Sequence, residues 1–393
     1  MKVLIVAYMI SSKRGSEYNV AWNHIKNLSP HCDIKLIYGT TGNHMGEKIE
    51  DFELDNLNIE RIFIKPDIIT QLYNLPNKSG IFKYSFYLAY KRWQFLAYEH
   101  CKKNNLFDKI DLLHFLNPIG FREPGVWYKA KVPFLWGPIG GFPLKEKTAK
   151  IDLGTEIYNI INVFQRRKIS VKTSIRKAKK VYAATLENKD LIDSTYSINS
   201  HYIPENGIPD DSISISEERF TNIKDLNIVW IGSNEKRKRL DLFLESILRI
   251  TKISAKVNVI GVNPIKDYLV PKNIHLIFHE KLAREEVINI LDQSHVHIIT
   301  SNREGNPTVL WEAASRGVPT ISFSNSGMSD TIPQGLGILL DKNSNSSDLA
   351  KTIENLVLNK TILDLHKIVV DNLHKFKWSS RTIFWLDQYN KSV

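Results

Sequence analysis

The sequence has little cysteine and no long apolar run, and each shortage excludes a class of protein. Its two cysteines, Cys32 and Cys101, provide neither a disulfide framework nor the paired spacing of a structural zinc site. No stretch approaches the roughly 18–20 apolar residues that a membrane-spanning helix requires. The apolar start from Val3 to Ile10 lacks a small-residue cleavage site, so we expect a buried strand there rather than a signal peptide. We therefore expect a cytoplasmic protein.

The sequence also lacks the short motifs that hold metals, dinucleotides or nucleic acids. It contains no Asp-x-Asp and no Cys-x-x-Cys, so we expect no metal bridging a diphosphate and no bound cofactor. The glycines of Gly137-Pro-Ile-Gly-Gly141 let a ligand approach the backbone, but they do not form the Gly-x-Gly-x-x-Gly fingerprint of a dinucleotide site. No motif that reads RNA or DNA is present, so nucleic acid is not an expected partner.

The composition is that of a globular protein with an uneven charge. Of its 393 residues, 42% are hydrophobic and 24% charged, and this length allows two domains. Residues 1–205 carry 30 Lys and Arg against 20 Asp and Glu, a net charge of +10, whereas the remainder carries 23 against 22, a net charge of +1. This asymmetry predicts an anionic partner for the first half. We expect peripheral contact with the inner face of an anionic membrane.

The first half opens with a strand, a helix and a second strand. Lys2 to Tyr8 is an apolar run, Glu17 to Leu28 has helical spacing, and Asp33 to Gly39 is apolar again. This βαβ order is typical of a doubly wound parallel sheet. Gly15 and Ser16 then lie at the start of the helix, where amides favour an anion, although a simple turn glycine explains Gly15 equally well.

Two segments of the first half combine bases with helical spacing. The segment from Ile81 to Lys103 is a predicted helix rich in aromatic residues, and Gln165 to Val181 is the densest basic run in the chain. Core packing explains most of the aromatic residues, and a solvated face explains most of the bases. The remaining basic and aromatic side chains fit a helix that lies on a membrane surface.

A second α/β set follows a polar, aperiodic link over residues 210–225. We expect strands at Leu226–Gly232, Val257–Gly261, Ile274–Phe278 and Val296–Thr300, and helices at Leu240–Ile250, Arg284–Ser294 and Trp378–Tyr389. The predicted domains are residues 1–205, residues 206–375 and a terminal helical segment, 376–393.

Two glutamates stand eight positions apart near the end of this second set. Glu304 lies in the turn Glu-Gly-Asn-Pro after a strand, and Glu312 lies about one turn into a helix from Thr308 to Ser315. The helix N-terminus faces the same crevice with its free N–H groups. Acidic groups for sugar hydroxyls beside amides for phosphate suit a nucleotide-sugar site. If only the spacing is considered, an ordinary βα unit with one acid in its loop and one in its helix explains it without a binding site.

The segment from Ser301 to Ser322 resembles the Glu-x7-Glu signature of family 4 glycosyltransferases, in the variant Glu-Gly-x-Pro-[Asn/Thr]-Val-Leu-x-Glu-Ala. Gly15-Ser-Glu, Asp111-x-x-His114 and Trp136-Gly-Pro-Ile-Gly-Gly141 resemble loops of the same family. The resemblance implies a GT-B fold, with two doubly wound Rossmann-like domains facing a central cleft and a terminal helix packed on the first domain. It also implies retaining transfer of a sugar from a UDP- or GDP-sugar to a hydroxyl of a surface polysaccharide or lipid-linked glycan.

The resemblance assigns a role to each matching residue. Glu304 would bind sugar hydroxyls beside the anomeric centre, Glu312 the ribose, and His114 the sugar from the first domain. The residues that it implies for the donor phosphates are Gly15, Ser16, Gly232, Ser233, Lys238, Thr308 and Val309. The last two supply amides because Pro307 has no N–H.

One position departs from the family pattern, which has an arginine where this chain has Ser233. One diphosphate contact is therefore missing, or Arg237 or Arg239 supplies it. An assembly subunit that keeps the fold without catalysis stays open for this reason. An epimerase of nucleotide sugars on the same fold is the other alternative.

Overall fold

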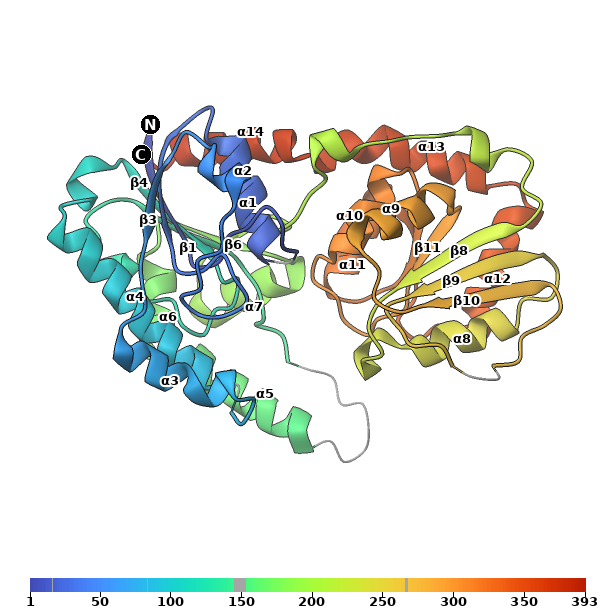
Figure 1. Ribbon diagram of the computed structural model, residues 1–393, viewed down its shortest axis with the longest axis horizontal. Helices are drawn as coiled ribbons and strands as arrows, with labels where there is room; N and C mark the ends of the chain where they lie inside the picture. Colours follow the sequence, from blue (N-terminus) through green and yellow to red (C-terminus); the bar gives the residue numbers. More distant parts are fainter. Residues whose placement is uncertain (16, 83, 145–152, 266–267) are drawn as a thin grey trace. The chain divides into compact units, whose positions relative to one another are not determined.

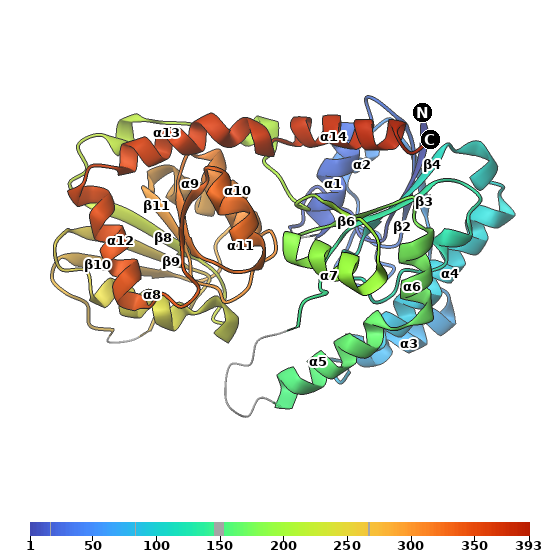
Figure 2. The same cartoon turned by 180° about the vertical axis from the view of Figure 1, so that it is seen from behind.

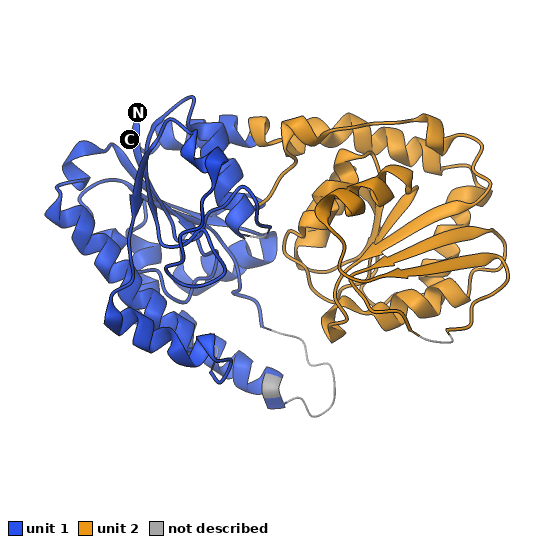
Figure 3. Ribbon diagram, viewed as in Figure 1, with its two compact units in different colours: residues 1–205, 381–393 blue, residues 206–380 orange. Residues whose placement is uncertain are grey.

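The computed structural model describes residues 1–15, 17–82, 84–144, 153–265 and 268–393, and these residues form two compact units (Figure 3). Unit 1 comprises residues 1–205 with 381–393, and unit 2 comprises residues 206–380. The predicted boundary after residue 205 coincides with the boundary between the units. The residues that rejoin unit 1 begin at Arg381 and not at residue 376.

Unit 1, which holds the N-terminus in Figure 1, is built on a parallel sheet. Its strand order is β3-β2-β1-β4-β5-β6-β7. Its strands are β1 (Lys2–Ala7), β2 (Asp33–Tyr38), β3 (Glu60–Phe63), β4 (Leu112–Asn117), β5 (Phe134–Ile139), β6 (Lys180–Ala183) and β7 (His201–Tyr202). The central strands are continuous apolar runs that are buried on both faces, as parallel strands covered by helices must be.

Helices cover both faces of this sheet. They are α1 (Glu17–Leu28), α2 (Phe52–Asp55), α3 (Ile68–Lys78), α4 (Ser85–Lys103), α5 (Leu153–Arg166), α6 (Ile169–Lys177), α7 (Leu186–Tyr196) and most of α14 (Trp378–Asn390). On one face Trp93 of α4 and Trp136 of β5 belong to the core. On the other, Trp22 of α1 packs in a second core with Trp385 and Tyr389 of α14.

Unit 2 repeats this architecture with a parallel sheet in the order β10-β9-β8-β11-β12-β13. Its strands are β8 (Leu226–Ile231), β9 (Ala255–Ile260), β10 (Ile274–His279), β11 (Val296–Ile299), β12 (Thr320–Phe323) and β13 (Gly337–Leu340). Its helices are α8 (Leu240–Leu248), α9 (Arg284–Gln293), α10 (Thr308–Ser315), α11 (Ser326–Thr331), α12 (Ser346–Leu358) and α13 (Ile362–Asn372). Helices α8 and α12 pack together over one face, and α9 and α10 lie over the other (Figure 2).

The predicted fold class, two doubly wound α/β domains, is confirmed, and most predicted elements differ from the structure by only a few residues. Three differences stand out. The aromatic helix begins at Ser85 and is preceded by α3, which packs against it. The aperiodic link over residues 210–225 contains two short 3-10 helices. Strand β5 continues through Gly137, where a loop was predicted. A Cβ at Gly137 would lie 2.3 Å from the Tyr182 carbonyl oxygen of β6, so the glycine allows a close approach of two strands and does not mark a loop.

Each sheet has one position where the order of its strands reverses. In unit 1 the chain runs outward from β1 to β3 and then returns to β4 on the other side of β1. In unit 2 it runs from β8 to β10 and returns to β11 beside β8. Ligands of open α/β sheets bind outside the carboxyl ends of the strands at such a point. Each unit therefore has one expected ligand site, β1/β4 in unit 1 and β8/β11 in unit 2.

Among the described residues, no helix combines the length with the apolar composition needed to cross a bilayer.

Candidate functional site

The reversal point of unit 2 brings two bases onto one buried carboxylate. The 3-10 turn Lys236–Lys238 follows β8, and Glu304 follows β11, the strand paired with β8. Lys238 Nζ lies 2.6 Å from Glu304 Oε1, and Arg237 Nη1 lies 3.1 Å from the same oxygen. Only 9% of the Glu304 side chain and 15% of the Lys238 side chain are exposed. The sequence predicted both residues for the site, and unit 2 joins them in one cluster.

Backbone contacts hold the two loops of this cluster together. The Thr300 hydroxyl donates a hydrogen bond to the Lys238 carbonyl oxygen at 2.7 Å. The Asn302 amide donates to the Arg237 carbonyl oxygen at 2.8 Å. Both acceptors belong to the turn after β8 and both donors follow β11. These hydrogen bonds therefore hold the turn that carries the two bases against the loop that carries Glu304.

The start of α11 supports the Glu304 loop from a third strand end. The Glu304 amide donates to Asn325 Oδ1 at 3.1 Å, and the Gly327 amide donates to the Glu304 carbonyl oxygen at 2.9 Å. A Cβ at Gly327 would lie only 1.6 Å from the Gly305 carbonyl oxygen, so the close approach requires glycine. The sequence reasoning missed Asn325 and Gly327. The turn Asn-Ser-Gly directly after a strand was the available signal.

The second glutamate, Glu312, lies in α10, one turn from its start. Arg284 Nε of α9 lies 3.1 Å from Glu312 Oε1. Burial raises the pKa of Glu312, and Arg284 opposes that shift. Thr308 and Val309 are the first two residues of α10, so their amides have no acceptor within the helix and can bind an anion.

Gly232 and Ser233 follow β8 as predicted, and Ser233 is exposed. The Ser233 hydroxyl donates to Glu235 Oε1 at 3.1 Å and does not replace an arginine. Of the two bases considered as replacements, Arg237 contacts Glu304. Arg239 instead lies 3.3 Å from Asn302 Oδ1.

In unit 1, His114 is part of the core. Its ring has no exposed surface. Its Nδ1 lies 2.6 Å from the Tyr389 hydroxyl, and its Nε2 lies 2.8 Å from the Gly137 carbonyl oxygen, so both ring nitrogens bond to protein. Burial lowers the pKa of His114 to about 4. The predicted contact between His114 and a donor sugar does not fit this geometry, because the ring offers no atom to a ligand. We correct its role to that of a structural residue.

Gly15, in the loop before α1, is not packed against other residues. A Cβ at Gly15 would meet no atom within 4 Å, so packing does not explain the glycine. Ser16, predicted beside it, lies outside the described residues.

Acidic, cysteine and histidine side chains are the groups that could act as metal ligands. Among the residues with described positions, no three of them gather as metal ligands would. The absence of a metal from the reaction stays a prediction.

Comparison with known proteins relates this geometry to glycosyltransferases. Residues 213–373 match the family Glycosyl transferases group 1, which covers β8 to α13 and the whole Glu304 cluster. No curated protein sequence matches the chain.

Similar solved structures cover the whole chain. Alr3699/HepE of Anabaena in complex with UDP and glucose is 13% identical with a TM-score of 0.62, and each chain is covered to 100%. Sucrose-phosphate synthase from Thermosynechococcus elongatus is 13% identical with a TM-score of 0.66, covering 99% of this chain and 98% of that one. A structure described as trehalose-6-phosphate from E. coli bound with UDP-2-fluoro glucose is 11% identical with a TM-score of 0.68, and each chain is covered to 100%.

At these identities the likeness concerns the fold alone. The two parallel α/β units have the GT-B fold, and residues 213–373 match the group 1 glycosyl transferase family.

Proposed function

We propose that the protein is a retaining, metal-independent glycosyltransferase that uses a nucleoside diphosphate sugar, with UDP or GDP as the leaving group. The observation that carries the proposal is the convergence of Lys238 and Arg237 on the buried Glu304 at the reversal point of unit 2. Similar structures that contain UDP, or UDP-2-fluoro glucose, support the choice of donor class.

A bound donor would contact Lys238 and Arg237, the two cations that contact Glu304 in this structure. A diphosphate is a stronger partner for Lys238 and Arg237 than one carboxylate, and the Thr308 and Val309 amides add donors at the start of α10. Glu304 would then be free to accept hydrogen bonds from sugar hydroxyls. Arg237 compensates for Ser233, because its guanidinium reaches the same oxygen as Lys238.

The chemical step needs charge stabilisation more than covalent catalysis. The bond between the anomeric carbon and the diphosphate breaks, and the acceptor oxygen forms the new bond on the same face of the sugar. The departing phosphate oxygen takes the proton of the acceptor hydroxyl. Lys238 and the helix-start amides stabilise the negative charge that develops on this phosphate. The carboxylate of Glu304 stabilises the positive anomeric centre.

Glu312 would bind the ribose hydroxyls of the nucleotide. Its carboxyl group is largely buried, only 14% of the side chain is exposed, and one oxygen remains for a ligand beside Arg284. Gly15 and Ser16 are proposed as further ligands of the donor phosphates, as the resemblance implies. An open environment around Gly15 supports this role.

We also propose that unit 1 contacts an anionic membrane, where a lipid-linked glycan or growing surface polysaccharide would supply the acceptor. Helix α5 exposes an apolar stripe at helical spacing, formed by Leu153, Ile157, Ile160 and Phe164. Helix α3 exposes a second, formed by Ile68, Leu72 and Leu75. Arg122 links α5 to α4 by donating to the Tyr158 hydroxyl at 2.6 Å and lying over the Tyr87 ring, and α3 packs on α4. Large exposed apolar surfaces beside bases are typical of membrane-facing helices.

A non-catalytic assembly subunit is the second candidate, and Ser233 is the observation that favours it. Such a subunit would bind no donor. An epimerase would bind UDP-sugars and convert them without an acceptor.

Calorimetric titration with UDP, GDP and 2′-deoxy-UDP tests the proposal. We expect binding of UDP or GDP. For UDP, we expect Glu312→Ala to weaken binding about tenfold to a hundredfold, because a hydrogen bond to a charged group contributes about 1.5–3 kcal/mol. The Glu312→Ala variant should also bind UDP and 2′-deoxy-UDP equally. Glu285→Ala, which changes an exposed residue of α9, serves as the control.

Absence of binding to either nucleotide contradicts the enzyme proposal. Equal UDP affinity in Glu312→Ala contradicts the ribose assignment.

A further inference from the structure

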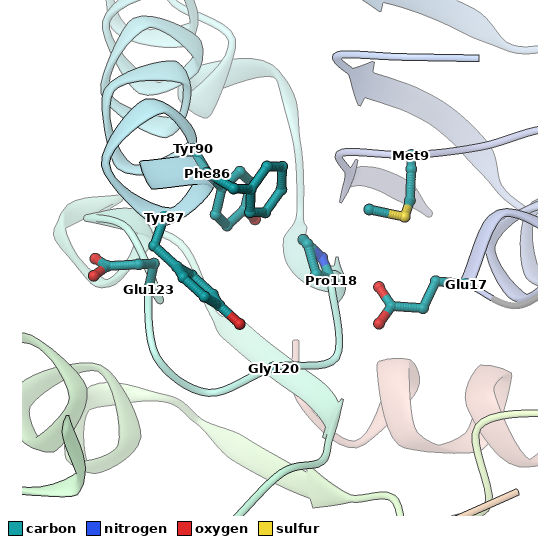
Figure 4. Close-up of a pocket in the computed structure, with 8 residues that line it drawn as sticks. All are labelled: Met9, Glu17, Phe86, Tyr87, Tyr90, Pro118, Gly120 and Glu123. Carbon is teal, nitrogen blue, oxygen red and sulfur yellow. The ribbon is translucent and has the colours of Figure 1, made fainter. Parts of the chain in front are cut away.

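A cavity of about 300 Å³ lies at the reversal point of unit 1 (Figure 4). Among the residues that line this cavity, Met9 lies just beyond β1. Pro118 and Gly120 follow β4, the strand paired with β1. The cavity therefore lies at the carboxyl ends of the two strands between which the strand order reverses. A ligand of an open α/β sheet is expected at this place. Among the described residues, none of those predicted for the donor lines it.

One carboxylate points into this cavity without a cation beside it. Glu17 is the first residue of α1, and its Oε2 accepts a hydrogen bond from the Ile119 amide at 3.3 Å. Across the described part of the chain, no lysine, arginine or histidine forms an ion pair with Glu17. Burial raises the pKa of Glu17 to about 7. Near neutral pH the group can therefore accept hydrogen bonds as a carboxylate or donate one as an acid.

The second acid of the wall is neutralised. Glu123 Oε1 lies 2.7 Å from Lys168 Nζ, and the Glu123 side chain is 11% exposed. Its carboxylate points away from the Glu17 side of the cavity (Figure 4). Glu17 is thus the acid of this wall that remains available to a ligand.

Aromatic rings of α4 form the opposite wall. Phe86 and Tyr90 are stacked with their centroids 5.8 Å apart, and Tyr87 directs its hydroxyl toward the cavity (Figure 4). The Tyr90 side chain is almost completely buried, and its hydroxyl has no hydrogen-bond partner among the described residues. A buried hydroxyl without a partner costs free energy unless a ligand or water supplies one.

These groups select one class of ligand. An anion is disfavoured, because Glu17 is acidic and no lysine or arginine is among the described residues that line the wall. Arg122 contacts the Tyr87 ring from outside the wall and donates to the Tyr158 hydroxyl. A purely apolar ligand would leave Glu17 and the Tyr90 hydroxyl without partners. A neutral ring with several hydroxyls satisfies both walls, since its hydroxyls bond to the carboxyl and phenol groups and its C–H face packs on aromatic rings. The cavity is large enough for one such ring.

We propose that this cavity binds a neutral sugar residue, and that Glu17 and the tyrosines Tyr87 and Tyr90 recognise its hydroxyls. The proposal rests on the glycosyltransferase function, for which this sugar would be the terminal residue of the acceptor. It assigns acceptor recognition to unit 1 and predicts a preference for uncharged sugars over uronic acids and sugar phosphates.

Saturation-transfer NMR with a panel of methyl glycosides tests the proposal. The panel contains neutral methyl hexosides, methyl glucuronide and glucose 6-phosphate, each added to the full-length protein without donor. We expect signals from at least one neutral glycoside and weaker or absent signals from the two anions. Glu17→Ala and Tyr87→Phe should each weaken binding of the responding glycoside by about tenfold or more.

Matched variants remove the same groups elsewhere on unit 1. Glu50 and Tyr73 are exposed and lie outside this cavity. The variants Glu50→Ala and Tyr73→Phe should therefore bind the glycoside as the wild type does. Tyr87→Phe removes only a hydroxyl, so it keeps the test valid if Glu17→Ala fails to fold. Thermal unfolding of each variant identifies such a failure.

Titration of the same variants with UDP separates this proposal from the proposed function. Retained UDP binding with lost glycoside binding supports a separate acceptor cavity. A protein that binds glycosides through Glu17 but no nucleotide keeps the sugar site and contradicts the donor site. Three outcomes overturn the sugar site: no signal from any neutral glycoside, equal signals from the wild type and both variants, or stronger signals from the anions.

Discussion

At the scale of single residues, the proposed donor would replace Glu304 as the partner of two basic side chains. Lys238 and Arg237 both contact its Oε1. The side chain of Lys238 is mostly buried, so it can contribute more to phosphate binding than an exposed lysine in high dielectric. Its neighbour Lys236 belongs to the same turn and is exposed. The two lysines therefore provide a matched pair of variants.

We predict that Lys238→Ala lowers the turnover of the donor sugar by about tenfold to a hundredfold, because a charge-assisted hydrogen bond to the leaving phosphate contributes about 1.5–3 kcal/mol. Lys236→Ala should stay within about twofold of the wild type. Release of nucleoside diphosphate from the responding donor, measured with saturating acceptor, gives the rates. Similar rates for Lys238→Ala and the wild type would assign the phosphate to another base.

His114 is a buried residue whose protonation should affect the stability of the fold. Its pKa of about 4 in the folded protein lies below the value of about 6.5 expected when unfolded. The folded state therefore holds the neutral ring, and the unfolded state binds the proton first as the pH falls. The resulting contribution to stability is complete above about pH 6.5 and is lost progressively down to about pH 4, by at most about 1.4 kcal/mol per pH unit.

We predict that the free energy of unfolding falls more steeply between pH 7 and pH 4 in the wild type than in His114→Gln, which keeps polar atoms but cannot be protonated in this range. Urea unfolding at a series of pH values gives both slopes. His31→Gln, at an exposed position, is the control for loss of a histidine. Parallel pH profiles for the wild type and His114→Gln would contradict the buried neutral ring.

At the scale of elements, the ends of β8, β11 and β12 build the site of unit 2 that we propose for the donor. The turn after β8 supplies the bases, the loop after β11 supplies Glu304, and α11 after β12 supports that loop through Gly327. Adjacent parallel strands end at the same edge of the sheet, so residues distant in sequence meet there. The backbone contact between Gly305 and Gly327 leaves no room for a side chain at the second position.

We predict that Gly327→Ala lowers the free energy of unfolding by about 1–3 kcal/mol, the usual cost of inserting an atom into a packed site. A Cβ at Gly305 meets no atom within 4 Å, so Gly305→Ala is the matched control and should cost less than about 0.5 kcal/mol. Chemical unfolding of both variants gives the comparison. Equal stabilities would mean that the Glu304 loop moves freely away from α11.

At the scale of the whole molecule, the net charge belongs to unit 1. Residues 381–393 add Arg381 and Lys391 against Asp387, so unit 1 has a net charge of +10 + 1 = +11 and unit 2 has 11 − 11 = 0. The exposed apolar stripes of α3 and α5 lie on this charged unit. Long-range attraction to an anionic surface and insertion of apolar side chains would therefore act on the same unit.

We predict that the protein binds vesicles containing phosphatidylserine and that Ile160→Asp weakens this binding about tenfold or more, because a buried isoleucine contributes about 1.5–3 kcal/mol. Co-sedimentation with vesicles measures the bound fraction. Leu358→Asp changes an exposed apolar residue of unit 2 and should have no effect. Binding should also fall as salt shortens the Debye length from about 10 Å at 0.1 M to about 3 Å at 1 M. Equal loss in both variants would contradict a specific surface on unit 1.

The sequence by itself determined the α/β class, most strands and helices of both halves, and the placement of Glu304 and Lys238 after strands and of Glu312 one turn into a helix. These are local properties, because apolar periodicity and turn residues act over a few positions. The resemblance to a glycosyltransferase signature also depended on a contiguous segment, and residues 213–373 match a glycosyl transferase family.

Only the tertiary structure decided which of these side chains are available to a ligand. In the sequence His114 lies in a strand-like run and Glu17 begins a predicted helix, but β4 buries the histidine between Tyr389 and Gly137, whereas α1 directs the glutamate into a cavity. Tyr389 is 275 positions from His114 in the chain. Burial and hydrogen-bond satisfaction depend on such distant partners, and no local pattern specifies them.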